Sequence, residues 1–166
     1  MADILEIQQL NKIISMLGDI KKVNGYLNDI REVNKVETDP EQIQQFPAVN
    51  LVMGDLEYPK YESGHHMKRR TYILDTYFRA NDAQAAQEIG LKLVADFEIR
   101  FADTTINGNT NYRQTANAYN LENTCLTVYP VSVTLWDASE NSDLYNIGWE
   151  FEVHFRQRAD NPTLQK

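Results

Sequence analysis

Two adjacent histidines come closest, by residue type and spacing, to a site for chemistry in this chain. His65 and His66 lie in a charged stretch, and neighbouring imidazoles are able to ligate a metal ion. A zinc site needs further ligands at suitable positions, and the third histidine, His154, is far along the chain. We therefore favour two solvated loop histidines. A small metal-dependent enzyme that uses His65, His66 and a carboxylate is the minor alternative.

A pair of carboxylates offers the second possibility. Glu150 and Glu152 are two residues apart, so they share one face of an extended strand. Such a pair does acid–base work when burial raises the pKa of one member. On an alternating strand, a solvated polar face is the simpler explanation. The spacing supports no Ser-His-Asp or Cys-His arrangement, and the scattered glycines form no phosphate-binding loop. We expect no catalytic residue, no cofactor and no metal ligand, and hence no enzyme.

Six residues are candidates for binding a partner. Three form the only basic cluster, which either contacts an acidic neighbour or a nucleic acid or simply marks the charged start of a strand. The other three are the large side chains of Asp103–Thr124, a polar segment without periodicity. Tyrosine and arginine are common anchors at interfaces, so we expect a long polar loop that orders against a partner. The six are Lys68, Arg69, Arg70, Tyr112, Arg113 and Tyr119.

Composition limits the classes of protein that the chain represents. Its 166 residues, 42% hydrophobic and 24% charged, fit one globular domain, residues 1–166. The sequence contains no run of about 18 apolar residues, so it predicts no membrane span. The acidic start MADILEIQQ is unlike a signal peptide. We expect synthesis in the cytoplasm. The net charge of −8 disfavours tight binding of duplex DNA but is compatible with DNA passing by. The single Cys125 is expected in the core.

The candidate residues are positioned by one strand and the helix that follows it. Arg70–Ala80 alternates large side chains on both faces, which predicts a strand with cover on both sides. Asn81 is the predicted helix cap, with Gln84 three residues on at the spacing of a capping box. A helix of about 20 residues then carries an apolar stripe that needs a sheet to pack on. The stripe is Ala86, Ile89, Leu93, Phe97 and Phe101.

A shorter helix is predicted at the N-terminus. Asp3 and Glu6 have the spacing of a capping box, and Gly18 is placed to end the helix. The helix is only about four turns long, so it must dock on another element. Its predicted apolar face is Ile4, Ile7, Leu10, Ile14 and Leu17.

The remaining segments predict the other strands of a sheet. Asp55–Met67 is interpreted as an exposed loop because it carries Pro59, Gly64 and mixed charge. Residues 159–166 are expected to form a short free tail. The predicted fold is α+β, with a mixed or antiparallel sheet of about four to five strands and both helices packed on it. The further strands are Arg31–Glu37, Pro47–Gly54, Cys125–Trp136 and Leu144–Arg156. For the first of them the spacing of the apolar residues also permits a helix, and the β-branched content favours the strand.

A family resemblance follows from these segments taken together. FPAVNLVMGD (Phe46–Asp55), a charged loop, RRTYILDTYFRAND (Arg69–Asp82), a long helix and two terminal strands resemble the tail terminator proteins of long-tailed bacteriophages. The similarity covers roughly Glu41 to Arg158 and rests on the order and texture of the elements. No invariant motif defines the contact surfaces of that family, so the resemblance assigns no residue to them.

The resemblance implies a structural virion protein at the head–tail joint. Such a subunit forms a homo-oligomeric ring, typically a hexamer, that caps the tail tube protein and ends its polymerisation. The ring meets the head connector or neck protein, and genomic DNA passes through its centre without specific binding. The alternative is a neck adaptor, a head-completion protein or a tail-tube-like subunit, because a fold does not by itself fix a role.

Overall fold

A five-stranded mixed sheet organises the molecule, and the fold is α+β as the sequence predicts. The computed structural model describes residues 4–62, 64–102, 121, 125, 127–137 and 143–158. The helical elements are α1 (Leu5–Gly18), the 3-10 turns η1 (Lys22–Asn24) and η2 (Pro40–Gln42), α2 (Ala83–Phe97) and the π-helical turn η3 (Glu98–Ala102). The strands are β1 (Glu32–Asn34), β2 (Ala48–Glu62), β3 (His65–Arg79), β4 (Thr127–Asp137) and β5 (Leu144–Arg158).

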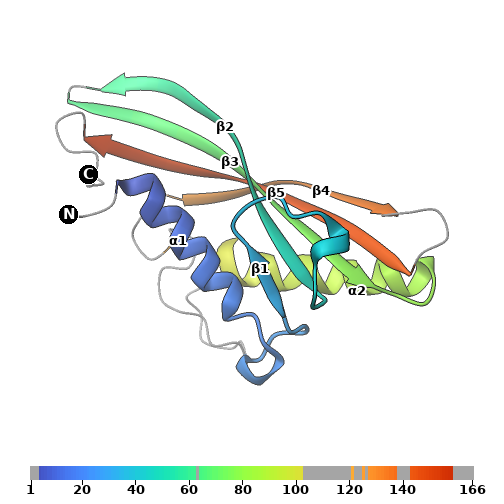
Figure 1. Cartoon of the computed structure of the whole chain (residues 1–166). Helices are drawn as coiled ribbons and strands as arrows, with labels where there is room; N and C mark the ends of the chain where they lie inside the picture. The colour runs from blue at the N-terminus through green and yellow to red at the C-terminus, as the bar shows by residue number, and fades with distance from the viewer. Residues whose placement is uncertain are drawn as a thin grey trace.

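The strand predicted at Arg70–Ala80 is part of β3, which is the central strand of the sheet. The strand order is β1-β2-β3-β5-β4, and only the β1–β2 pair is parallel. β3 pairs with β5 without interruption, from His65 opposite Arg158 to Arg79 opposite Leu144. The long β2–β3 hairpin runs to the upper left of Figure 1, past the start of α1. A central strand this long fixes which side chains face the helices along the whole sheet.

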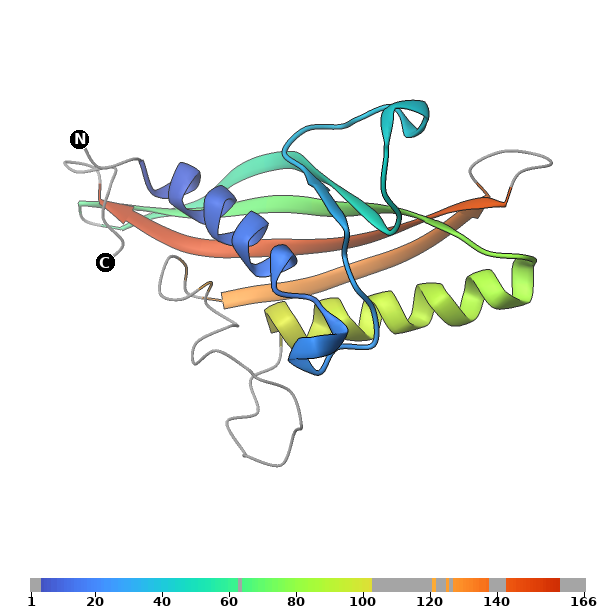
Figure 2. The ribbon, with the colours of Figure 1, turned by 60° about the horizontal axis from the view of Figure 1, so that its bottom comes forward.

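Both helices pack on one face of the sheet, which is the face that carries Tyr72 and Leu74 (Figure 2). Aromatic rings form the middle of this layer: Phe97 stacks on Trp149 at 5.7 Å between centroids, and Phe101 lies 5.8 Å from Phe151. All four rings are at most 1% exposed. The segment that contains η2 lies over the opposite face, so the prediction of cover on both sides of β3 is confirmed near its middle.

The long helix has the predicted length and stripe but a different cap. Asp82, and not Asn81, occupies the N-cap position, where its Oδ1 accepts the backbone N–H of Ala85 at 2.8 Å. Both residues have side chains suited to capping, and the chain leaves β3 one residue later than the capping-box spacing suggests. α2 with η3 extends to Ala102, and the predicted stripe faces the sheet through Leu93, Phe97 and Phe101.

The buried face of α1 differs from the predicted one. Ile4 and Ile7 are 41% and 42% exposed, whereas the buried residues are Leu5, Gln9, Ile13, Met16 and Leu17. The predicted face was wrong by about one residue at its start, because apolar residues surround much of this helix and several stripes fit the spacing. The helix ends at Gly18 as predicted. Ile4 holds the N-cap position without a side-chain hydrogen bond, and Asp3 lies outside the described residues.

The segment predicted as an exposed loop, Asp55–Met67, is a β-hairpin. β2 continues to Glu62, and β3 begins at His65 after a turn in which Gly64 has φ of 75°. Two register shifts, between Met53 and Leu56 and between Glu57 and Lys60, interrupt the pairing. Each shift breaks the regular alternation of polar and apolar residues. Because a strand is predicted from that alternation, the sequence did not predict a strand here.

The other strands match their predictions with altered ends. β1 is shorter than the predicted Arg31–Glu37, β4 lies within one or two residues of Cys125–Trp136, and β5 extends the last strand to Arg158. Of the predicted loop Asp103–Thr124, only Leu121 belongs to the described residues, and the predicted tail 159–166 lies outside them. Cys125 is 1% exposed, as expected for a core residue, and burial raises the pKa of its thiol to about 12.

Candidate assembly surface

The predicted basic cluster is paired within the chain. Arg70 Nη2 donates to Glu6 Oε1 at 2.6 Å, Lys68 Nζ lies 3.5 Å from the other oxygen of Glu6, and Arg69 pairs with Glu57. The side chains of Lys68, Arg70 and Glu6 are at most 16% exposed. These contacts hold the first turn of α1 against β3. Tyr112, Arg113 and Tyr119, the other candidates, lie outside the described residues.

The two adjacent histidines lie on a strand and not in a loop. His65 and His66 begin β3, so their side chains leave opposite faces of the sheet. His66 lies 5.0 Å from the ring of Tyr61, between centroids, and 6.1 Å from that of Tyr58. Two side chains on opposite faces do not converge on one ion. Within the described part of the chain, no group of three or more His, Cys, Asp or Glu could hold a metal ion.

The third histidine and the carboxylate pair share the polar face of β5. His154 Nε2 lies 2.9 Å from Glu152 Oε2, and Glu150 accepts from the hydroxyl of Ser132 at 3.1 Å. Both carboxylates are partly exposed, as the alternation predicts. Because these groups satisfy each other on an accessible face, a role in the structure of the sheet explains them.

Strand β4 forms one edge of the sheet and exposes an unusual number of apolar side chains. Thr127–Leu135 contains no charged residue. The β4 edge, as we call its exposed apolar residues, consists of Tyr129 (53% exposed), Val131 (50%), Val133 (47%) and Leu135 (39%). Proteins that remain monomeric commonly protect an edge strand with charges, and this strand has none before Asp137.

A bulge explains why apolar residues appear on both faces of this edge. The register shifts between Pro130, opposite Phe151, and Ser132, opposite Glu150. Before the shift, Tyr129 lies on the polar face, with its ring 4.9 Å from that of His154. After the shift, Val133 and Leu135 lie opposite Trp149 and Ile147, on the face that the helices cover. Proline suits such a position because no ladder hydrogen bond is lost.

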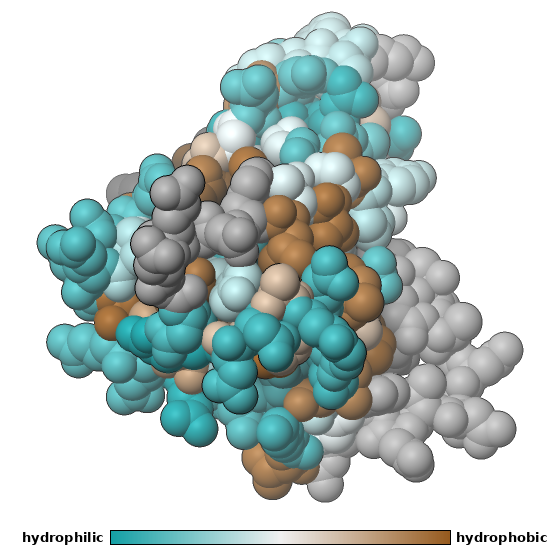
Figure 3. Space-filling model, turned by 90° about the vertical axis from the view of Figure 1, so that its right-hand side faces the viewer, coloured by the Kyte–Doolittle hydropathy of each residue, from teal (hydrophilic) through white to brown (hydrophobic). Residues whose placement is uncertain are grey.

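The helix layer covers the β4 edge only in part. Gly90 allows α2 to approach closely, since a Cβ there would lie 3.1 Å from Ile147 Cδ1 and 3.7 Å from Leu135 Cδ1. Even so, Val133 and Leu135 stay accessible, and Leu91 on α2 is 70% exposed. Figure 3, seen from the right-hand side of Figure 1, shows apolar side chains gathered across the middle of this end. Grouped apolar exposure of this kind marks an interaction site.

The opposite edge of the sheet has a different character. β1 pairs with β2 only over Ala48–Asn50, so the outer side of β2 has no further strand beside it within the described residues. Asp55 and Glu57 are exposed there, and the two register shifts bend the strand. β2 also exposes Met53, Tyr58 and Tyr61, but its exposed carboxylates are the feature that commonly protects an edge strand. The two edges of the sheet are therefore chemically distinct.

Comparison with known proteins gives no independent assignment. No protein-family model matches the chain, and no curated protein matches it significantly. Among the described helices, none is long and apolar enough to cross a bilayer.

Sequence reasoning recognised β4 as a strand but missed its edge as a candidate surface. The apolar content of the strand is visible in the sequence, and a proline such as Pro130 is typical of a bulge or an edge strand. Whether an apolar strand is central or peripheral depends on the strand order, which the pattern of one strand does not contain. The absence of charge over nine residues, Thr127–Leu135, is the signal that could have found it.

Proposed function

We propose that the chain is a structural subunit that assembles into a closed ring through its β4 edge and caps the end of a bacteriophage tail tube. The observation that carries the proposal is the uncharged edge strand with its exposed apolar side chains, which has β5 on one side and no further strand on its outer side among the described residues. A second copy of the chain is the occupant we assign to it. The phage setting rests on the resemblance of residues 41–158 to tail terminator proteins.

A ring requires that the β4 edge meets a different surface of the next copy. Pairing of the same patch on both subunits produces a two-fold dimer, whereas a head-to-tail contact produces a ring when its rotation closes. The two edges of this sheet differ in charge, since β2 carries Asp55 and Glu57 whereas Thr127–Leu135 has no charged residue, and this difference favours a head-to-tail contact. In such a contact the apolar side chains of the β4 edge become buried, which is favourable. The unpaired side of the β4 backbone forms hydrogen bonds with the next copy.

Capping a tail tube requires a ring of subunits and no catalytic step. A ring that adds to the last ring of the tube and offers no repeat of the tube surface stops polymerisation. Its other face then meets the head connector, in the virion at the head–tail joint. The net charge of −8 suits a passage for DNA because it provides little affinity for phosphates.

A capping assay tests this role against the neck-adaptor alternative. The purified subunit is mixed with polymerising tail tube protein from the same phage, and tube lengths are measured by negative-stain imaging. A terminator shortens the tubes in proportion to its concentration and appears at one end of each. Deletion of its gene then produces tails of uncontrolled length. Unchanged tube lengths, or binding to the portal side alone, would assign the chain to the neck instead.

A further inference from the structure

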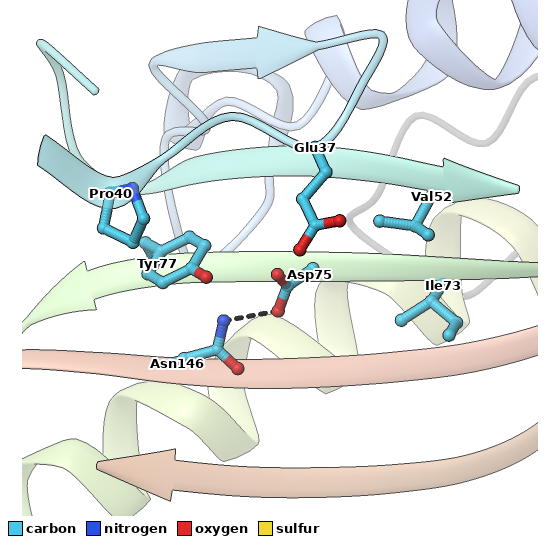
Figure 4. Close-up of a pocket in the computed structure, with 7 residues that line it drawn as sticks. All are labelled: Glu37, Pro40, Val52, Ile73, Asp75, Tyr77 and Asn146. Carbon is cyan, nitrogen blue, oxygen red and sulfur yellow. Dashed lines mark hydrogen bonds between the residues drawn. The ribbon is translucent and has the colours of Figure 1, made fainter. Parts of the chain in front are cut away.

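A cavity on the sheet face opposite the helices gathers acidic and polar groups that the assembly role does not use. Its volume is about 410 Å³, within the range of small-molecule sites. Figure 4 shows Glu37, from the segment that crosses this face, pointing toward Asp75 on β3. Tyr77 and Asn146 line the same space. Its apolar walls are Pro40, Val52 and Ile73.

The hydrogen-bond donors of this cavity are already used. Asn146 Nδ2 and the hydroxyl of Tyr77 both donate to the carboxylate of Asp75. Asn146 is 5% exposed, and its Oδ1 accepts no hydrogen bond from any described residue. Glu37 makes no hydrogen bond or ion pair with the described residues either. The site therefore presents spare acceptors and negative charge, so a ligand must supply donors and positive charge.

The electrostatic surroundings of Asp75 also favour a positively charged ligand. Burial raises the pKa of its carboxyl, and the negative charge of Glu37 raises it further, while the bonds from Asn146 and Tyr77 only partly offset this. No lysine, arginine or histidine is among the described residues that line the cavity. A carboxylate in this position lacks a counter-charge, and a cation placed between Asp75 and Glu37 would relieve that cost.

We propose that the cavity between Glu37 and Asp75 binds an organic cation with a short alkyl chain, an ammonium or guanidinium group of the size carried by lysine or arginine. The cationic head lies between the two carboxylates (Figure 4). The alkyl chain packs on Val52 and Ile73, which lie together on one side of the carboxylates (Figure 4). This binding is independent of the ring proposed above, because the cavity lies on the strands β2, β3 and β5 and not on the β4 edge.

Titration of the full-length protein with n-butylammonium and n-butylguanidinium, followed by NMR, tests the proposal. The expected result is saturable shifts of the Asn146 side-chain amide and of the Val52 and Ile73 methyl groups, with dissociation constants of roughly millimolar size for such small ligands. Neutral n-pentanol, which has a similar shape, should bind at least about tenfold more weakly. Equal binding of the alcohol, or no saturable shift at these groups, would overturn the proposal.

Two variants test whether Glu37 and Asp75 are the carboxylates that bind the cation. Glu37→Gln removes an exposed carboxylate that supports no described contact, and we expect it to weaken cation binding by about tenfold without unfolding the protein. Asp75→Asn should weaken binding at least as much. Glu88→Gln, an exposed carboxylate on α2, is the control and should bind normally. Binding that survives both Glu37→Gln and Asp75→Asn contradicts the assignment.

The same experiments separate the two sources of such a cation. If the source is a free diamine, putrescine binds the isolated subunit at this site as the probes do. If the source is a basic side chain of another protein molecule, butylguanidinium displaces that molecule from the wild-type subunit, and Glu37→Gln binds it more weakly. Either result identifies the source of the cation, whereas the probe titration by itself decides whether the cation site exists.

Discussion

Asp96 shows how one buried carboxylate fixes the path of the chain between α1 and β1. It is fully buried on α2, where Oδ1 accepts from Leu27 N at 2.8 Å. Oδ2 accepts from both nitrogens of Asn28, at 2.9 Å for the backbone and 2.8 Å for the side chain. Three charge-assisted bonds on one side chain make it the strongest local tie between these segments.

We expect Asp96→Ala to lower the free energy of unfolding by about 3 kcal/mol, because two backbone N–H groups lose their acceptor. The matched control is Asp29→Ala. Asp29 accepts one bond, from Lys22 N at 2.7 Å, at an exposed position, so its loss should cost about 1 kcal/mol or less. Urea unfolding of the three proteins measures the difference. Equal losses in the two variants would show that burial of Asp96 contributes nothing.

Asp75 makes the stability depend on pH in the opposite sense from a paired carboxylate. Its pKa in the folded protein lies above the ordinary value of 3.8 because the carboxyl is buried, so the folded state binds the proton more tightly. The free energy of unfolding therefore falls as pH rises from about 3.8 through the folded pKa, and it stays lower above that value.

Asp75→Asn should remove this dependence and leave the variant gaining on the wild type as pH rises from about 4 to about 7. Urea unfolding at three pH values in this interval, without added amines, provides the comparison. Control measurements on Glu88→Gln should follow the wild type. A difference between Asp75→Asn and wild type that stays constant with pH would mean that Asp75 is not destabilised by burial.

Residue-level roles were the least accessible to sequence reasoning. Lys68 and Arg70 were visible as a charge cluster, but their common partner Glu6 is more than sixty residues away in the chain. Asp75 and Asp96 look like ordinary polar positions in a strand and a helix. Their burial and partners depend on segments brought together only by the fold, and local patterns contain no such information.

At the scale of elements, α2 and β5 form the core around stacked rings. Phe97 is fully buried and its ring lies over Trp149, while Trp149 and Phe151 have centroids 5.0 Å apart. Phe97 lies on the apolar stripe predicted for the helix, and Trp149 and Phe151 alternate with Glu150 and Glu152 along β5. The stripe of α2 and the alternation of β5 were predictable because long, regular elements repeat their signal several times.

Truncation of one ring should therefore be costly. We expect Phe97→Ala to lower the free energy of unfolding by roughly 3–5 kcal/mol, as for other large-to-small changes in a core. Leu91→Ala, on the same helix but 70% exposed, is the control and should change stability by less than about 0.5 kcal/mol. A loss under about 1 kcal/mol for Phe97→Ala would mean that the packing of α2 is misassigned.

The failures at this scale have one physical cause in common. In the β2–β3 hairpin, two register shifts broke the alternation, and in α1 the apolar residues allowed more than one face. Pattern arguments depend on a period that is both regular and unique. They succeed for β3, β5 and α2, and they fail where a bulge or an excess of apolar residues removes one of these conditions.

At the scale of the whole molecule, the sheet has one protected edge and one exposed edge. Asp55 and Glu57 lie on β2, whereas Thr127–Leu135 has no charge. The asymmetry suits repeated head-to-tail contacts. The order of the strands decides this property, and the sequence predicted the number of strands without their order. The assembly surface could therefore be derived only from the folded chain.

Native mass spectrometry of the purified chain, with the ring imaged by negative stain, tests the central claim most directly. We predict one closed oligomer, of about six copies if the resemblance holds. Val133→Lys should convert it to monomer with the fold intact, because a lysine on an edge strand blocks association. Val23→Lys, at a valine that is 88% exposed elsewhere, should leave it unchanged. A wild-type protein that stays monomeric or forms only a two-fold dimer, or a Val133→Lys variant that still assembles, would contradict the account.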